Sequence, residues 1–192
     1  APGAAAAATL RLVPVTFAEG VEQFPAWSPD GTQLAFTAEV GGVRQIFVKR
    51  LASGVERRVT SGPFDDIQPA WSPDGRAILL VRSRQAGKQL QPGDVFGQYD
   101  GGDVWSVDLA SGKEVRLLEN AFNPSFSPDG KQIAVDAGWA GPRRIWIVGS
   151  GGSNPQQVTS DVSEAVVHVR PRWSPDGTRI VFQNIERTKF DV

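Results

Sequence analysis

The stretch PAWSPDG occupies residues 25–31, and the chain repeats it three more times with little change. The second copy is identical, and the third and fourth read PSFSPDG and PRWSPDG. The four copies occupy residues 25–31, 69–75, 124–130 and 171–177. Their serines follow one another at steps of 44, 55 and 47 residues. Steps of this size are close to the length of one four-stranded propeller blade, roughly 40–45 residues, so the phrase indicates a repeat protein.

The four residues SPDG have the chemistry of a tight hairpin turn. Pro29 fixes φ at about −65° for the second position of a type I turn, and Asp30 tolerates the third position. Gly31 can then adopt the left-handed conformation that closes a hairpin with a one-residue bulge. An aromatic residue precedes each turn, and we expect this ring to pack between neighbouring sheets. These rings belong to Trp27, Trp71, Phe126 and Trp173.

Short apolar segments follow each turn at a constant spacing. After Gly31 the chain reads QLAF, QIFV and RRVT, segments rich in the β-branched, aromatic and aliphatic residues that favour strands. The step from Phe47 to Thr60 is 13 residues, as is the step from Trp146 to Thr159. No window has a sustained helical period. We therefore predict an all-β fold, a β-propeller made of four-stranded antiparallel blades, with about four blades present, three complete and one split or truncated.

The repeat also predicts boundaries. Residues 1–8, APGAAAAA, are expected to be a flexible leader, and residues 9–192 a single β-propeller domain or propeller segment. The blades are expected at residues 24–60, 68–118, 123–159 and 170–192, with a further strand at residues 10–16. Either this strand joins the last blade and closes a small four-bladed ring, or the chain is an arc of a larger ring, which we favour. An arc would expose blade edges and allow self-association.

Composition excludes several classes of protein and site. The formal net charge of −1 does not point to a nucleic acid partner, and no apolar run approaches the ~20 residues needed for membrane insertion. The chain has no cysteine, and His168 is its single histidine, so Cys-ligated and multi-histidine metal sites are excluded. No G-x-S-x-G elbow is present. We therefore expect no cofactor, no metal, no catalytic residues and no enzyme activity within this chain.

Candidate binding residues lie where the units differ. In a four-stranded blade, the turns after the first and third strands share one face, and the connections after the second and fourth strands share the other. The SPDG turns are regular, whereas the second face carries the variation in length that is typical of binding loops. There the second unit has 14 extra residues within residues 83–103, which include Tyr99 and Asp100. Trp139 stands in the corresponding loop of the third unit, either packed locally or exposed to a partner.

Two further groups of polar residues are candidate sites. The insertion holds Asp94, Asp100 and Asp103, but their spacing does not match a calcium-binding loop, so a solvated flexible loop is preferred to a metal site. Four residues ahead of the first strands are expected near the mouth of the central channel, as binding residues or as an ordinary polar rim. They are Glu22, Asp66, His168 and Arg170. The pair Arg143–Arg144 is expected to be a solvated strand or loop end.

The repeat as a whole resembles that of TolB-type β-propellers, which reads approximately P-x-W-S-P-D-G, an apolar strand, an I-W/F/Y-V strand and a closing R-x-L/V-T. PAWSPDGTQLAF, QIFV and ERRVT fit this pattern, and the resemblance covers about residues 9–190. It implies a non-catalytic propeller that binds or scaffolds a protein or peptide, in a periplasmic or secreted location. Similar repeats occur in the gating propeller of prolyl-oligopeptidase-like hydrolases and in sensor regions of bacterial regulators or kinases, which remain alternatives.

Overall fold

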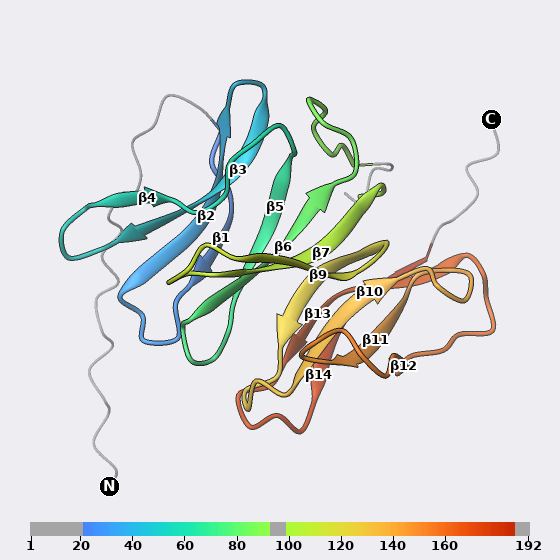
Figure 1. Ribbon diagram of the computed structural model, residues 1–192. Coiled ribbons are helices and arrows are strands. Elements are labelled where there is room, and N and C mark those ends of the chain that lie inside the picture. Colours follow the sequence, from blue (N-terminus) through green and yellow to red (C-terminus); the bar gives the residue numbers. More distant parts are fainter. Residues whose placement is uncertain (1–20, 93–98, 187–192) are drawn as a thin grey trace, which may run out of the picture.

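The computed structural model describes residues 21–92 and 99–186. Within these residues the chain forms fourteen strands and no helix, arranged as four antiparallel sheets that follow one another along the chain (Figure 1). The first sheet contains β1 (Gln23–Trp27), β2 (Gln33–Val40), β3 (Val43–Arg50) and β4 (Glu56–Arg58). The second contains β5 (Asp66–Trp71), β6 (Ala77–Ser83), β7 (Gly102–Asp108) and β8 (Glu114–Leu118).

The third sheet repeats this arrangement, and the fourth contributes two strands to the described residues. The third contains β9 (Ala121–Phe126), β10 (Gln132–Ala137), β11 (Arg144–Gly149) and β12 (Gln156–Gln157). The fourth pairs β13 (Val166–Trp173) with β14 (Ile180–Glu186). The prediction of four-stranded antiparallel blades is therefore confirmed for three units. The expected leader, the strand at residues 10–16 and the chain beyond residue 186 lie outside the described residues.

The SPDG phrase forms the turn between the first and second strands of every blade. In the first blade, Ser28 Oγ donates a hydrogen bond of 2.6 Å to Asp30 Oδ1, and Gly31 N–H donates one of 2.9 Å to the Ser28 carbonyl oxygen. Gly31 has φ of 69°, in the left-handed region where glycine avoids the cost of a Cβ atom. The other three turns have the same bonds and φ near that value. The predicted turn chemistry is confirmed.

The first strands of the blades lie side by side, β1 against β5, β5 against β9 and β9 against β13. Each of them has an irregular register at the residue before its proline. These residues have φ between 52° and 57°, although a residue before proline is normally extended. They are Phe24, Gln68, Asn123 and Arg170. A β-bulge is thus part of the repeat, and we call these four strands the inner strands.

Apolar side chains from neighbouring sheets form the core between blades. Between the second and third blades, Val81 and Phe122 belong to one buried cluster with Ile133. Between the first and second blades, Trp71 is buried and its Nε1–H donates a 3.0 Å hydrogen bond to the Ala26 carbonyl oxygen. The equivalent Trp27 is 60% exposed, because no described sheet precedes β1. The predicted packing of the aromatic ring between sheets is therefore seen at Trp71.

Candidate functional site

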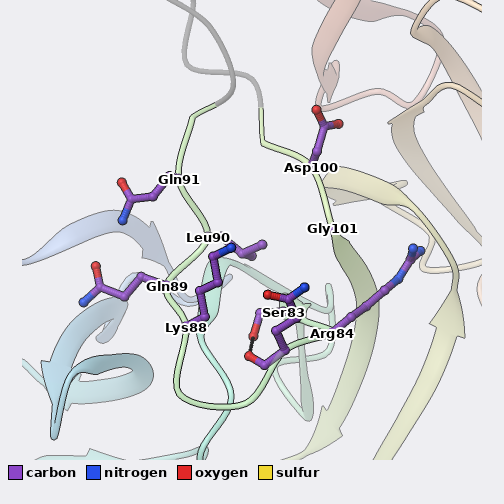
Figure 2. A pocket seen from close by; sticks show the side chains of 9 residues that line it. Ser83, Arg84, Lys88, Gln89, Leu90, Gln91, Asp100 and Gly101 are labelled. Carbon is purple, nitrogen blue, oxygen red and sulfur yellow. Dashed lines mark hydrogen bonds between the residues drawn. The ribbon is translucent and has the colours of Figure 1, made fainter.

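The insertion of the second blade lies between β6 and β7, on the face opposite to the SPDG turns. Gly87 N–H donates a 2.7 Å hydrogen bond to the carbonyl oxygen of Pro63, in the connection between β4 and β5. The two kinds of connection therefore meet on one face, as the repeat predicts, and we call it the loop face. A cavity of about 400 Å³ lies within the insertion. Figure 2 shows that residues from both arms of the loop line it, including Leu90 and Asp100.

One buried ion pair attaches the insertion to the first blade. Asp65 Oδ2 lies 2.6 Å from Nη2 of Arg44, and both side chains are almost completely buried. The same oxygen of Asp65 accepts a 2.8 Å hydrogen bond from Leu90 N–H, while the Arg44 guanidinium donates to the Leu90 carbonyl oxygen. Leu90 is buried with the core of the second and third blades. These contacts hold one arm of the insertion in a defined position.

A second set of contacts attaches the other arm to the third blade. Arg143 Nη2 lies 2.6 Å from Oδ1 of Asp100 and donates to the Tyr99 carbonyl oxygen. The guanidinium carbon lies 4.4 Å from the ring centroid of Phe122, a cation–π distance. Arg143 Nη1 donates a 3.0 Å hydrogen bond to Oδ1 of Asp136. Arg143 therefore connects the two insertion residues that the sequence singled out to the interior of the third blade.

Asp136 is the centre of a polar network that continues to the inner strands. Its Oδ2 accepts a 2.7 Å hydrogen bond from Asn123 Nδ2 and a 2.9 Å hydrogen bond from Arg170 N–H. Asn123 N–H in turn donates to Gln68 Oε1 at 2.7 Å. Burial raises the pKa of the Asp136 carboxyl, and the charge of Arg143 opposes that increase. The network joins Asp100 on the loop face to the bulges of three inner strands.

A cleft of about 350 Å³ on the loop face lies beside Arg143. The insertion of the second blade, the β10–β11 loop, the connections before and after the third blade, and the start of β13 form it. We call it the loop-face cleft. Its lining residues are Asp100, Asn120, Gly138, Gly141, Pro142, Arg143, Glu164 and Val167. Asp100 and Glu164 are exposed, so the cleft presents acidic groups to solvent around an arginine that is already paired.

Trp139 packs locally at the side of this cleft. Its ring lies 5.1 Å from the ring of Trp146 in an edge-to-face arrangement, and its Nε1–H donates a 2.8 Å hydrogen bond to the Glu119 carbonyl oxygen. The residue is half-buried and follows Gly138, which lines the cleft. The structure therefore supports the local-packing alternative.

Two of the four residues expected at the channel mouth are inside the protein. Asp66 is completely buried, and its Oδ1 accepts a 2.6 Å hydrogen bond from Arg82. His168 is buried on β13 with its ring 4.9 Å from that of Phe182, and burial lowers the pKa of this histidine. Neither residue can act at a rim, because the fold turns both side chains into the packed blades.

The other two residues are nearer to solvent. Glu22 is half-buried just ahead of β1, and its Oε1 has no hydrogen-bond partner in the described part of the chain. Arg170 is exposed at the bulge of β13, and its Nη1 donates a 2.5 Å hydrogen bond to Gln183 Oε1. The four residues do not form a single group. Of these four residues, Arg170 takes part in the Asp136 network, because its backbone N–H donates to Asp136 Oδ2.

The aspartates of the insertion are used for ion pairs. Asp103 Oδ1 lies 2.6 Å from Arg84 Nη2, and Asp100 is paired with Arg143. Asp94 lies outside the described residues. Across residues 21–92 and 99–186, no group of three or more histidine, aspartate or glutamate side chains is arranged to hold a metal ion. The same part of the chain contains no helix of the length and apolarity needed to span a bilayer.

The expectation that Arg143–Arg144 is a solvated pair is wrong. Arg144 is buried, and its Nη1 donates a 2.6 Å hydrogen bond to the Val166 carbonyl oxygen of the next blade. The Arg143 side chain is 10% exposed. Sequence reasoning missed both residues because their partners lie on other strands or in other units. The available signal is their position at the loop face, at the start of a third strand, where Arg44 also stands.

The inner strands surround a second cavity of about 290 Å³, which we call the axial cavity. All four blades contribute to its lining through residues 24–26, 68–71, 123–126 and 172. Three of the prolines that follow the bulges, Pro25, Pro69 and Pro124, form part of its wall. The axial cavity therefore lies where a propeller has its central channel.

Comparisons with known proteins agree with this architecture. A family model described as the TolB beta propeller domain matches residues 6–107, more than half of the chain. The crystal structure of TolB from Acinetobacter baumannii superposes with a TM-score of 0.69 at 20% identity, over 88% of this chain and 39% of that one. This likeness confirms the predicted propeller fold.

Two curated relatives are similar in sequence over most of the chain. The uncharacterized peptidase YuxL of Bacillus subtilis is 29% identical over 171 residues, which are 88% of this chain and 23% of YuxL. The Tol-Pal system protein TolB of Francisella tularensis subsp. holarctica is 28% identical over 164 residues, 83% of this chain and 34% of that protein. The chain thus spans about a quarter to a third of the length of these relatives.

Proposed function

The chain belongs to the TolB β-propeller domain family, and from this premise we propose that it is a non-catalytic propeller segment that binds or scaffolds a protein or peptide. The partner contacts the loop face, around the loop-face cleft. Shape and loop chemistry provide recognition, because a propeller supplies a rigid scaffold on which loops of variable length are displayed. A relative named as a Tol-Pal system protein supports this proposal. The resemblance to TolB-type propellers also supports a periplasmic or secreted location for the protein.

One observation carries the proposal. The ion pairs of Arg44 and Arg143 hold the two described arms of the insertion in place. This part of the loop face therefore has a defined shape. Near it lie the half-buried Trp139, next to Gly138 of the cleft, and the exposed carboxylates of Asp100 and Glu164. A half-exposed indole beside charged groups is the kind of surface that contributes most to protein binding.

The test begins with peptides selected from a random display library against the whole chain. Affinities of the selected peptides are then measured for the wild type, Trp139→Ala and Glu164→Lys, with Lys131→Ala on the opposite face as the control. We expect the two cleft variants to lose about tenfold or more in affinity, whereas Lys131→Ala retains it. Peptides that bind all four proteins equally would overturn the proposal, provided that circular dichroism shows each variant to be folded.

A second function is favoured by the similarity to YuxL, which is named a peptidase. In that case the chain would be the propeller that controls substrate access to a hydrolase domain encoded beside it. The nucleotide sequence of the gene distinguishes the two functions, because an α/β-hydrolase domain carries a G-x-S-x-G elbow. A winged-helix or kinase pattern in the same gene would instead support a sensor propeller.

A further inference from the structure

The four inner strands provide an internal comparison at the residue that follows each bulge proline. This position is occupied by Ala26, Ala70 and Ser125 in the first three blades and by Arg172 in the fourth. All four residues line the axial cavity. Three blades therefore place a small side chain there, and one places a guanidinium group. The architecture does not require an arginine at this position, since the other copies form the same bulge without one.

Arg172 lacks the carboxylate partner that three of the more buried arginines have. Arg44, Arg82 and Arg143 each have a carboxylate oxygen within 3.0 Å. Arg172 Nη1 donates a 2.8 Å hydrogen bond to the carbonyl oxygen of Pro171, and no carboxylate among the described residues lies within ion-pair distance of it. A guanidinium has five N–H donors in a planar fork, so most of its hydrogen-bonding capacity is unused here.

The carboxylate that attracts Arg172 cannot supply the missing partner. Asp136 attracts the Arg172 charge, but its two oxygens already accept hydrogen bonds from Arg143, Asn123 and the backbone of Arg170. Arg170 opposes the Arg172 charge by repulsion. The Arg172 cation is therefore attracted by a carboxylate that is engaged elsewhere and repelled by a second cation, an arrangement that an added anion would improve.

The surroundings of Arg172 combine low solvation with access from solvent. Surrounding protein atoms remove part of the hydration of the guanidinium, and this desolvation lowers the pKa of Arg172. The residue is nevertheless exposed, and it borders the axial cavity. Ion pairs formed in such a setting are stronger than those on an open surface, since fewer water molecules compete for the charges.

We propose that the axial cavity binds a carboxylate through Arg172. A carboxylate matches the planar fork of the guanidinium and can accept two parallel hydrogen bonds from it. The prolines and the two alanines of the lining would contact the apolar part of the ligand, and the Ser125 hydroxyl offers one further polar group. A volume of about 290 Å³ suits a short carboxylic acid or the last residue of a peptide. The site is separate from the loop-face cleft and does not depend on the function proposed there.

Calorimetric titration of the whole chain with three probes tests this site. The probes are propionate, the tripeptide Gly-Ala-Ala with a free carboxylate, and the same tripeptide with an amidated C-terminus. We expect binding of at least one free carboxylate and binding of the amidated peptide that is weaker by about tenfold or more, because the amide lacks the charge. If propionate alone binds, the carboxylate that the site recognises belongs to a small acid. If the free peptide alone binds, that carboxylate is the C-terminus of a peptide chain.

Arg172→Ala is the informative variant, because alanine already occupies the same place in two other blades. We expect it to fold as the wild type does and to lose carboxylate binding by about tenfold or more. Arg179→Ala removes an exposed arginine next to the SPDG turn of the same blade and should leave carboxylate binding unchanged.

Three outcomes would overturn the site. They are no binding of any of the three probes at millimolar concentration, equal binding of the free and amidated peptides, or wild-type affinity in Arg172→Ala. Trp139→Ala, which tests the loop-face cleft, should leave carboxylate binding unchanged, so failure of one proposal is distinguishable from failure of the other.

Discussion

Arg143 Nη1 lies 3.0 Å from Oδ1 of Asp136, and this ion pair joins the loop face to the inner strands of the propeller. On one side Arg143 holds Asp100 of the insertion, and on the other Asp136 holds the bulges at Asn123 and Arg170. Each of these residues belongs to a different unit or a different strand. The pair is therefore a point at which three blades depend on one another.

We predict that Asp136→Asn lowers the free energy of unfolding by about 3–5 kcal/mol, because it leaves the charge of Arg143 desolvated without its buried partner. Urea denaturation of the wild type and the variant measures this change. Glu56→Gln is the matched control, since it removes one charge from the partly exposed Lys49–Glu56 pair and should cost less than about 1 kcal/mol. A loss of the same size in both variants would contradict the central role of Asp136.

We predict that Gly102→Ala destabilises the protein by about 1–3 kcal/mol through overpacking. A Cβ atom at this position would lie 2.7 Å from Cγ1 of Val81 and 3.1 Å from Cε1 of Phe122, both of which are completely buried. Gly151→Ala is the control, because its Cβ would meet nothing within 4 Å. Thermal unfolding of both variants checks the prediction, and equal midpoints would refute it.

We predict that the SPDG turns make stability depend on acid pH. The hydrogen bond from Ser174 lowers the pKa of Asp176 to about 2, from 3.8 in the unfolded chain. Since the folded pKa is the lower one, the turn stabilises the fold fully above about pH 4, and this contribution is lost as the pH falls toward 2. Ser174→Ala should raise the pKa of Asp176, as measured by NMR titration of its carboxyl carbon. An unchanged titration curve would show that the hydroxyl is not the cause.

We predict that the chain self-associates through β14. The outermost strands of the three complete blades have three, five and two residues, whereas β14 has seven and pairs only with β13 among the described strands. Val181 on this strand is 69% exposed. Val181→Lys should reduce association in sedimentation experiments, because lysine on an edge strand opposes pairing. Val162→Lys, in an exposed loop, should not, and a wild type that remains monomeric at high concentration would rule out the prediction.

The fold was predictable because each unit carries its own local signals. Pro29, Asp30 and Gly31 determine a turn without reference to the rest of the chain, and the spacing of the apolar segments then gives the strands. The site was predictable only in part. The position of the insertion was visible as a departure from the repeat, but the partners of Arg143 and Asp66 come from other strands or blades, and no local pattern reveals such pairings. Arg172 was visible in PRWSPDG against PAWSPDG, yet its place at the axis depends on the bulge before each proline.

The residues that follow the bulge prolines line the axial cavity and lie outside the SPDG turns. Each inner strand contributes the residue after its proline from its own copy of the unit, and these four residues are far apart in the sequence. The hydrogen bonds of the SPDG turns do not involve the side chains of these four residues. A library that varies residues 26, 70, 125 and 172 would therefore sample the chemistry of one cavity, one blade at a time, while the four SPDG turns stay the same.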